Sequence, residues 1–233
     1  MPTPMTPERF QDRFEAYKGE PQQVSGIWQL YADIRAGKPP EQVLIEEAPW
    51  AKTFSEKRSK PNPLVRPYFW QSDNGPEGWR QCQTSAIAME LAGQGVRGIA
   101  DDLDYLRIVN RFGDTTEQET HRRALAFLKV QASFSKLWAA NTIKACIDRG
   151  VGFVAGILHH GPNTAPTGGG HYVLVIGYTD THYICHDPFG ELDMVGGGWV
   201  SRAKGAGKLI RYTQANFHRR WDVKGERWGW VIG

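Results

Sequence analysis

The 233-residue sequence has few cysteines and no long hydrophobic run. Its three cysteines, Cys82, Cys146 and Cys185, lie far apart and form no CxxC pair, which excludes a zinc ribbon and a disulfide framework. No apolar run approaches the roughly 18 residues that a membrane span requires. The first residues also lack the basic and apolar segments of a secretory signal. We therefore expect a cytoplasmic protein without membrane insertion.

The overall composition is that of an ordinary globular protein, with 40% hydrophobic and 23% charged residues. The net charge of +3 permits an anionic partner but does not indicate nucleic acid. The nine Trp and 26 Gly residues suggest loops that carry aromatic side chains near a ligand surface. We expect a monomer with no nucleic-acid partner, no cofactor and no bound metal.

The chain divides into a helical N-terminal segment, residues 1–60, and a domain over residues 61–233. Three prolines and four basic residues within 57–67 indicate a linker at the boundary. Beyond it, helices are predicted first and strands afterwards, which favours an α+β fold. The capping-box pattern Thr116 to Glu119 is expected to open the third helix. The predicted helices span 83–91, 101–111, 116–128 and 141–149, and the predicted strands span 152–158, 171–178, 181–186, 208–213 and 228–232.

Cys82 is the candidate nucleophile because it stands at the start of a predicted helix. Unpaired backbone N–H groups and the positive end of the helix dipole favour a thiolate there. A cysteine can also be simply a small buried hydrophobic residue. That interpretation suits Cys146, inside a helix, and Cys185, inside a strand, better than it suits Cys82.

A cysteine nucleophile needs a base and a group that orients the base. His171 follows three glycines and begins a predicted strand, and Asp187 ends the next strand. A hairpin through the turn at 179–181 would bring Asp187 towards the level of His171. Alternatively, His171 is a structural residue and Asp187 only starts an Asp-Pro turn. Gln71 is a candidate oxyanion donor upstream of Cys82; out of this context it would be an exposed polar residue.

These motifs resemble those of a known family. Four blocks occur in order: Tyr-x-x-Gln-x-Asp-Asn, Cys-x-x-Thr-Ser-x-Ala-Met, Gly-Gly-His-Tyr-Val-x-Val-x-Gly-Tyr and His-Asp-Pro-x-Gly. Together they resemble the C39-like cysteine peptidases of the papain-like superfamily, from about Tyr68 onward. The resemblance implies a papain-like fold of helices on an antiparallel sheet, with a Cys82, His171 and Asp187 triad and Gln71 at the oxyanion. The chain departs from the usual Gly-Pro after the nucleophile, where it has Gln83 and Thr84.

The favoured function is cleavage of a peptide bond in bacterial peptidoglycan, because free-standing domains of this kind resemble bacteriophage lysins. We expect substrate contacts at Trp79, Gly169, Gly170 and Tyr172, and release to the cell wall during phage lysis. The alternatives are an intracellular or virion protease of proteins or peptides, and an inactive module that binds peptide or wall. The basic, Trp-rich segments 217–221 and 224–230 would suit an anionic wall; alternatively, their Trp side chains pack in the core and their Arg side chains are solvated.

Two other clusters offer weaker chemistry. Asp101, Asp102 and Asp104 could bind a cation, but they lack the Gly and distal Glu of an EF-hand, so an N-cap with an acidic first turn is favoured. Zinc could be held by His159 and His160 with His171, Cys185 and His186, but no helical HxxxH pair or CxxC supports a metal site.

Overall fold

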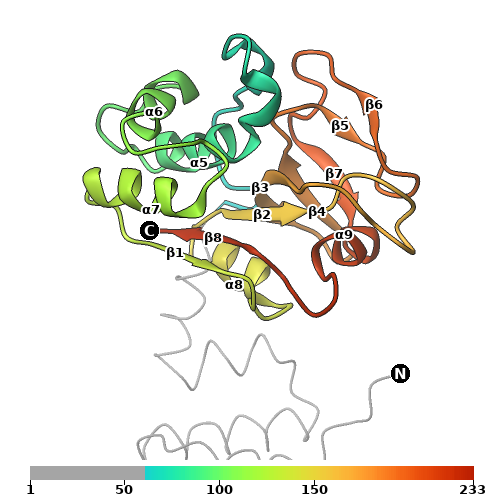
Figure 1. Cartoon of the computed structure of the whole chain (residues 1–233). Coiled ribbons are helices and arrows are strands. Elements are labelled where there is room, and N and C mark those ends of the chain that lie inside the picture. Colours follow the sequence, from blue (N-terminus) through green and yellow to red (C-terminus); the bar gives the residue numbers. More distant parts are fainter. Residues whose placement is uncertain (1–60) are drawn as a thin grey trace, which may run out of the picture. The chain divides into compact units, whose positions relative to one another are not determined.

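The computed structural model describes residues 61–233, so the helical segment predicted for residues 1–60 lies outside the described residues. Helices pack on a six-stranded antiparallel sheet of order β1-β8-β2-β3-β4-β7, beside a smaller β5-β6 pair (Figure 1). The fold is α+β, as predicted. The strands are β1 (Ala132–Ser135), β2 (Phe153–Ile157), β3 (His171–Tyr178), β4 (His182–His186), β5 (Glu191–Leu192), β6 (Trp199–Ser201), β7 (Ile210–Thr213) and β8 (Gly229–Ile232).

Two hydrophobic clusters occupy the two faces of the sheet. Helices α5, α6 and α7 contribute to the first cluster and lie together in Figure 1, whereas α8 and α9 supply side chains to the second. The helices are η1 (Gln71–Asp73), η2 (Gly78–Arg80), α5 (Cys82–Gly93), α6 (Asp102–Val109), α7 (Gln118–Phe127), α8 (Thr142–Asp148) and α9 (Gln214–Trp221).

Strand β3 lies between the two clusters. Tyr172, Leu174 and Ile176 pack into the first cluster, while Val173 and Val175 pack into the second. A strand that is covered on both faces is apolar throughout, which explains the unbroken hydrophobic run after His171. The strand ends at Tyr178 and returns antiparallel as β4, so the predicted hairpin is confirmed.

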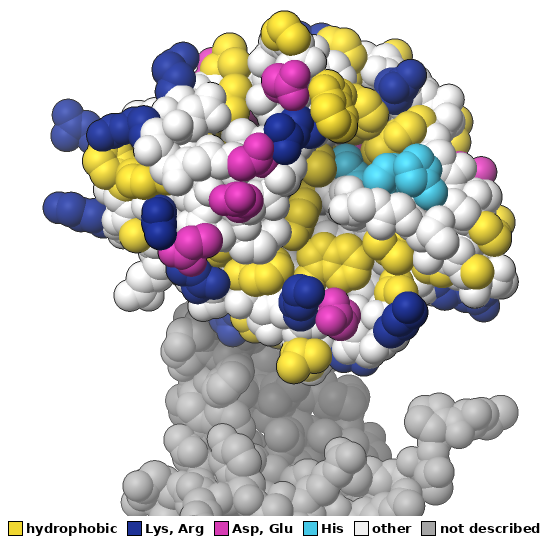
Figure 2. All heavy atoms as spheres, viewed as in Figure 1, with side chains coloured by type: hydrophobic (Ala, Val, Ile, Leu, Met, Phe, Trp, Pro, Cys, Tyr) yellow, Lys and Arg dark blue, Asp and Glu magenta, His cyan; other side chains and the backbone are white. Residues whose placement is uncertain are grey.

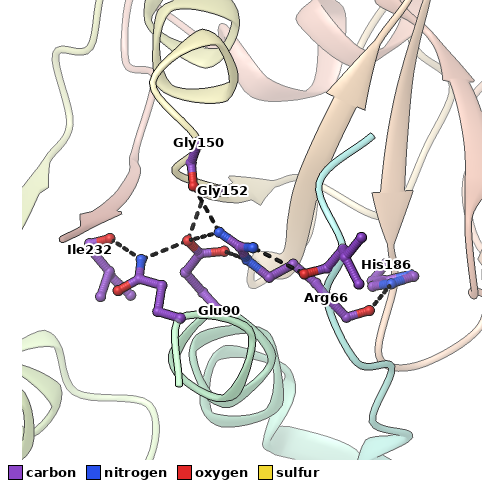
Figure 3. Close-up of polar contacts among 8 residues, drawn as sticks. Arg66, Glu90, Gly150, Gly152, His186 and Ile232 are labelled. Carbon is purple, nitrogen blue, oxygen red and sulfur yellow. Dashed lines mark hydrogen bonds and ion pairs between the residues drawn. The ribbon is translucent and has the colours of Figure 1, made fainter. Parts of the chain in front are cut away.

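Helix α5 runs through the interior, and even its glutamate is buried. Glu90 accepts hydrogen bonds from the Arg66 guanidinium at 2.7 and 3.0 Å and from the Gly152 backbone N–H at 2.9 Å (Figure 3). Gln94, at the end of the helix, donates to Glu90 at 2.7 Å and to the carbonyl of Ile232 at 2.6 Å. A buried carboxylate needs such partners, and they fix α5 against both β8 and the segment before η1.

The capping box predicted at Thr116 is wrong. Helix α7 begins at Gln118 with Glu117 as its N-cap, and the Thr116 hydroxyl donates to Asp114. The capping box instead opens α6, where Asp101 and Asp104 cap one another's backbone N–H groups. The N-cap interpretation of this acidic cluster is therefore confirmed.

Helix α9 and the short strands β1, β5 and β6 were not expected from the sequence. In α9, Phe217, Arg220 and Trp221 are fully buried, as is Trp230 in β8. These side chains cannot form the basic, Trp-rich surface that we considered for an anionic wall. The alternative is right that Trp221 and Trp230 pack in the core, but wrong that Arg220 is solvated.

Candidate active site

A cavity of about 1000 Å³ opens between the start of α5 and the start of β3. Both Cys82 and His171 line it, although 88 positions separate them in the chain. On this face, Figure 2 shows histidine side chains next to hydrophobic ones at the edge of a hollow. The predicted substrate contacts Trp79, Gly169, Gly170 and Tyr172 also line the cavity.

Cys82 is the first residue of α5 and is partly exposed, whereas the other cysteines are fully buried. No side chain caps this end of the helix, which leaves the backbone N–H groups of the first turn available for a negative charge. Burial raises the pKa of the Cys146 thiol, and it raises the pKa of the Cys185 thiol even more. Cys82 is thus the one free thiol in the described chain that a ligand in the cavity can reach.

His171 and Asp187 are in direct contact. The Nε2–H group of His171 donates to Asp187 Oδ1 at 2.7 Å, and both side chains are buried. The β3–β4 hairpin produces this contact because His186 pairs with Leu174, which places the next residue, Asp187, near the start of β3. Since Nε2 bonds to Asp187, Nδ1 is the ring nitrogen left to interact with the Cys82 sulfur, which also helps to raise the pKa of His171.

This environment favours the protonated imidazole. Burial disfavours the charge on His171, but the Asp187 carboxylate and the hydrogen bonds to Asp187 and Cys82 outweigh it and raise the pKa of His171 to about 10. At neutral pH the site therefore holds an imidazolium between a sulfur and a carboxylate.

Three aromatic residues that we did not predict complete this site. Trp199 stands edge-on to the His171 ring at 4.8 Å between centroids, and Phe189 packs on Trp199 at 4.9 Å. Tyr212 donates from its hydroxyl to Asp187 Oδ2 at 3.0 Å. Together they shield the His171–Asp187 hydrogen bond from water. Only their positions in the fold reveal them, because Trp199 and Tyr212 come from separate short strands.

Gln71, the predicted oxyanion donor, is buried in η1 and does not line the cavity. Its Nε2 donates to the Gly78 carbonyl at 2.8 Å, and its Oε1 has no protein partner. Its backbone N–H donates to the Pro188 carbonyl at 2.9 Å, which holds η1 beside the segment that carries Asp187.

The cavity wall on the glycine-rich side is held by one buried arginine. Arg220 donates to the carbonyls of Leu158, His160 and Gly161 on one loop and of Met194 on another, at 2.8–3.3 Å. His159 lies on this wall, with its ring 6.1 Å from that of His171. Burial, with the neighbouring histidines, lowers the pKa of His159 to about 4.

The described residues contain no group of three or more His, Cys, Asp or Glu side chains that could hold a metal ion. Within the same part of the chain, no helix is both long and apolar enough to cross a bilayer.

The α+β architecture, with Cys82 and the Asp187-bonded His171 lining one cavity, is the arrangement expected of a hydrolase built around a cysteine. The family model of the Peptidase C39 like family matches residues 64–221, and the chain belongs to this family. It is thus a cysteine peptidase-type hydrolase. A crystal structure described as that of a C39-like peptidase from Bacillus anthracis is similar at 14% identity and a TM-score of 0.49, covering 72% of this chain and 94% of that one. A comparison with curated proteins gives no match.

Proposed function

We propose that the chain is a cysteine endopeptidase that cleaves peptide bonds of bacterial peptidoglycan, with Cys82 as nucleophile, His171 as acid and base, and Asp187 as the orienting group. The observation that carries this proposal is the buried 2.7 Å contact between His171 and Asp187 beside the one accessible thiol of the described residues. A nucleophile, a base and an orienting acceptor in this order are the parts that acyl transfer requires.

The Cys82 thiolate attacks the carbonyl carbon of the scissile amide, and a C–S bond forms. The Cys82 backbone N–H, at the uncapped end of α5, stabilises the oxyanion. His171 gives its Nδ1 proton to the amine nitrogen as the C–N bond breaks. His171 then takes a proton from water, whose oxygen attacks the thioester, and the free acid and the thiolate are released. Gln71 remains a predicted second oxyanion donor.

The shape and charge of the cavity support a peptidoglycan substrate. It is open enough for a branched glycopeptide, and Trp79, which is 65% exposed, offers a flat apolar face. Three cations, Arg80, Lys136 and Lys224, line it; Arg80 pairs with Asp114 at 2.9 Å and Lys136 with Glu226 at 3.5 Å, so the excess positive charge lies on Lys224. A cleft with excess positive charge attracts anionic substrates, and peptidoglycan stem peptides carry free carboxylates.

The test is to incubate the protein with purified bacterial cell walls and to identify the released fragments by mass spectrometry. We expect new amino and carboxyl termini at one peptide bond, and complete loss of cleavage in Cys82→Ala. Cys146→Ala is the matched control because that thiol is buried away from the cavity. If the protein cleaves peptides but not cell walls, it is a general peptide protease. If it cleaves neither but still binds peptides or walls, it is an inactive binding module.

A further inference from the structure

Gln118, the first residue of α7, lies between the neighbours of the two reacting side chains. Its Nε2 donates to Tyr172 Oη at 2.9 Å and to Gln83 Oε1 at 3.1 Å. Gln83 follows Cys82 on α5, and Tyr172 follows His171 on β3. The nucleophile and the base belong to different halves of the fold, and Gln118 bonds to the residue next to each.

The orientation of the Gln118 amide is fixed by its partners. Its Oε1 accepts from Gln83 Nε2 at 2.8 Å and from Trp230 Nε1 at 3.0 Å. An indole N–H can only donate, so the oxygen must face Trp230 and the nitrogen must face Tyr172. Both amide hydrogens and both lone pairs are then used. An amide with no free hydrogen-bonding capacity is a rigid connector, because any rotation breaks several bonds together.

Gln83 contributes from the other side of this connection. It is 2% exposed and lines the cavity directly after the nucleophile. The reciprocal pair of hydrogen bonds between Gln83 and Gln118 ties the first turn of α5 to the first turn of α7.

We infer that Gln118 is a positioning residue that sets the distance between the Cys82 sulfur and the His171 imidazole by bridging Gln83 and Tyr172. This inference rests on the proposed function of Cys82 and His171. Gln118 touches neither reacting atom; it acts through the residue that follows each of them. A displacement of about 1 Å between reacting groups can cost on the order of 100-fold in rate.

The test compares Gln118→Met, which keeps the length of the side chain and removes all four hydrogen bonds, with Tyr172→Phe, which removes one hydroxyl. The matched control is Gln94→Met, which removes two amide hydrogen bonds at the far end of α5, outside the cavity. Each folded variant is treated with iodoacetamide at pH 6 to 8, labelling of Cys82 is followed by mass spectrometry, and thermal unfolding is recorded in parallel.

We expect the reaction of Cys82 at pH 6 to slow by about tenfold in Gln118→Met and by a few-fold in Tyr172→Phe. Gln94→Met should lower the melting temperature and leave the labelling profile unchanged. If Cys82 of Gln118→Met is labelled at the wild-type rate at every pH, the inference is overturned. If Gln118→Met does not fold, wild-type labelling rates in Tyr172→Phe overturn it instead. Slowed labelling in a protein that does not cut cell walls supports the inference and refutes only the proposed substrate. A wild-type Cys82 that is inert at pH 6 refutes both.

Discussion

The charge of Asp187 can be removed with little change of shape. In Asp187→Asn, the remaining oxygen can still accept from His171 Nε2 at 2.7 Å and from the Phe189 backbone N–H at 3.1 Å. The Tyr212 hydroxyl, now 3.0 Å from Oδ2, can rotate to accept from the new amide. The substitution therefore tests the carboxylate charge separately from the hydrogen bonds.

The expected effect follows from what holds the proton on His171. Burial alone would place the pKa of His171 below its ordinary 6.5, and the charge of Asp187 is the largest influence that raises it to about 10. The net rise from 6.5 to about 10 favours the imidazolium by about 5 kcal/mol, at about 1.4 kcal/mol for each pKa unit, and loss of the charge removes the largest of the contributions that produce this rise. In the wild type, this stabilisation is complete below pH 6.5 and is lost as the pH rises through about 10. The stability of the variant should change less over this range.

The assay is the rate of iodoacetamide labelling at Cys82 between pH 6 and 9. We expect Asp187→Asn to react more than tenfold slower than wild type at pH 6 to 7, because the imidazolium that stabilises the thiolate is lost. Asp148→Asn is the control, since Asp148 bonds to the Tyr178 hydroxyl outside the cavity. Wild-type rates at every pH in a folded Asp187→Asn protein would refute the role given to this charge.

Three further predictions concern stability and the cavity floor. Glu90→Gln leaves the buried Arg66 cation without its carboxylate and should lower the free energy of unfolding by about 3–5 kcal/mol in urea titrations. Gly156→Ala places a methyl group 1.7 Å from the present Trp228 Nε1, so Trp228 must move. Because Trp228 lines the cavity, kcat/KM should fall several-fold while labelling of Cys82 persists. Burial lowers the pKa of His121 to about 4, so stability should fall by up to about 3 kcal/mol as the pH drops from 6.5 to 4, and His121→Gln should flatten this dependence.

Each of these predictions has a comparison that could contradict it. Glu119→Gln removes only exposed ion pairs with Arg122 and Arg123 and should lower the free energy of unfolding by less than about 1 kcal/mol. If Glu90→Gln lowers it by the same small amount, burial does not strengthen the Arg66–Glu90 ion pair. Unchanged tryptophan fluorescence and kcat/KM in Gly156→Ala would show that Trp228 does not support the substrate. Equal stability of the wild type at pH 7 and pH 4.5 would contradict the argument for His121.

The sequence predicted the parts of this protein whose signals are local. Strand β3 begins and ends as expected, because the glycines before His171 and the apolar run after it mark both ends. The start of α5 at Cys82 and the α6 N-cap at Asp101 also depend on short-range preferences. The family motifs brought Cys82, His171 and Asp187 together as candidates before any distance was known.

The residues that the sequence did not predict acquire their roles only through tertiary contacts. Trp199 stands in a strand of three residues, too short for a periodic signal. Tyr212 lies in a strand that was predicted, but only the pairing of that strand beside β4 brings its hydroxyl to Asp187. Helix α9 was missed because two arginines and a histidine within 217–221 resemble a solvated surface. Burial of Arg220 depends on carbonyl groups from loops about 25 and 60 positions away, which no local pattern encodes.

The carbonyl cage around Arg220 has a consequence for ligand recognition. Four side-chain hydrogen bonds from its guanidinium join the loop of residues 158–161 to the loop of residues 193–195. They add to the backbone hydrogen bonds, from Gly198 N–H to the His159 carbonyl and from Asn163 N–H to the Val195 carbonyl, that also join these two loops. Flexible loops must lose conformational freedom when a ligand binds, and that loss weakens affinity. Here the entropy is given up when the chain folds, so an incoming peptide meets a wall that already has its final form.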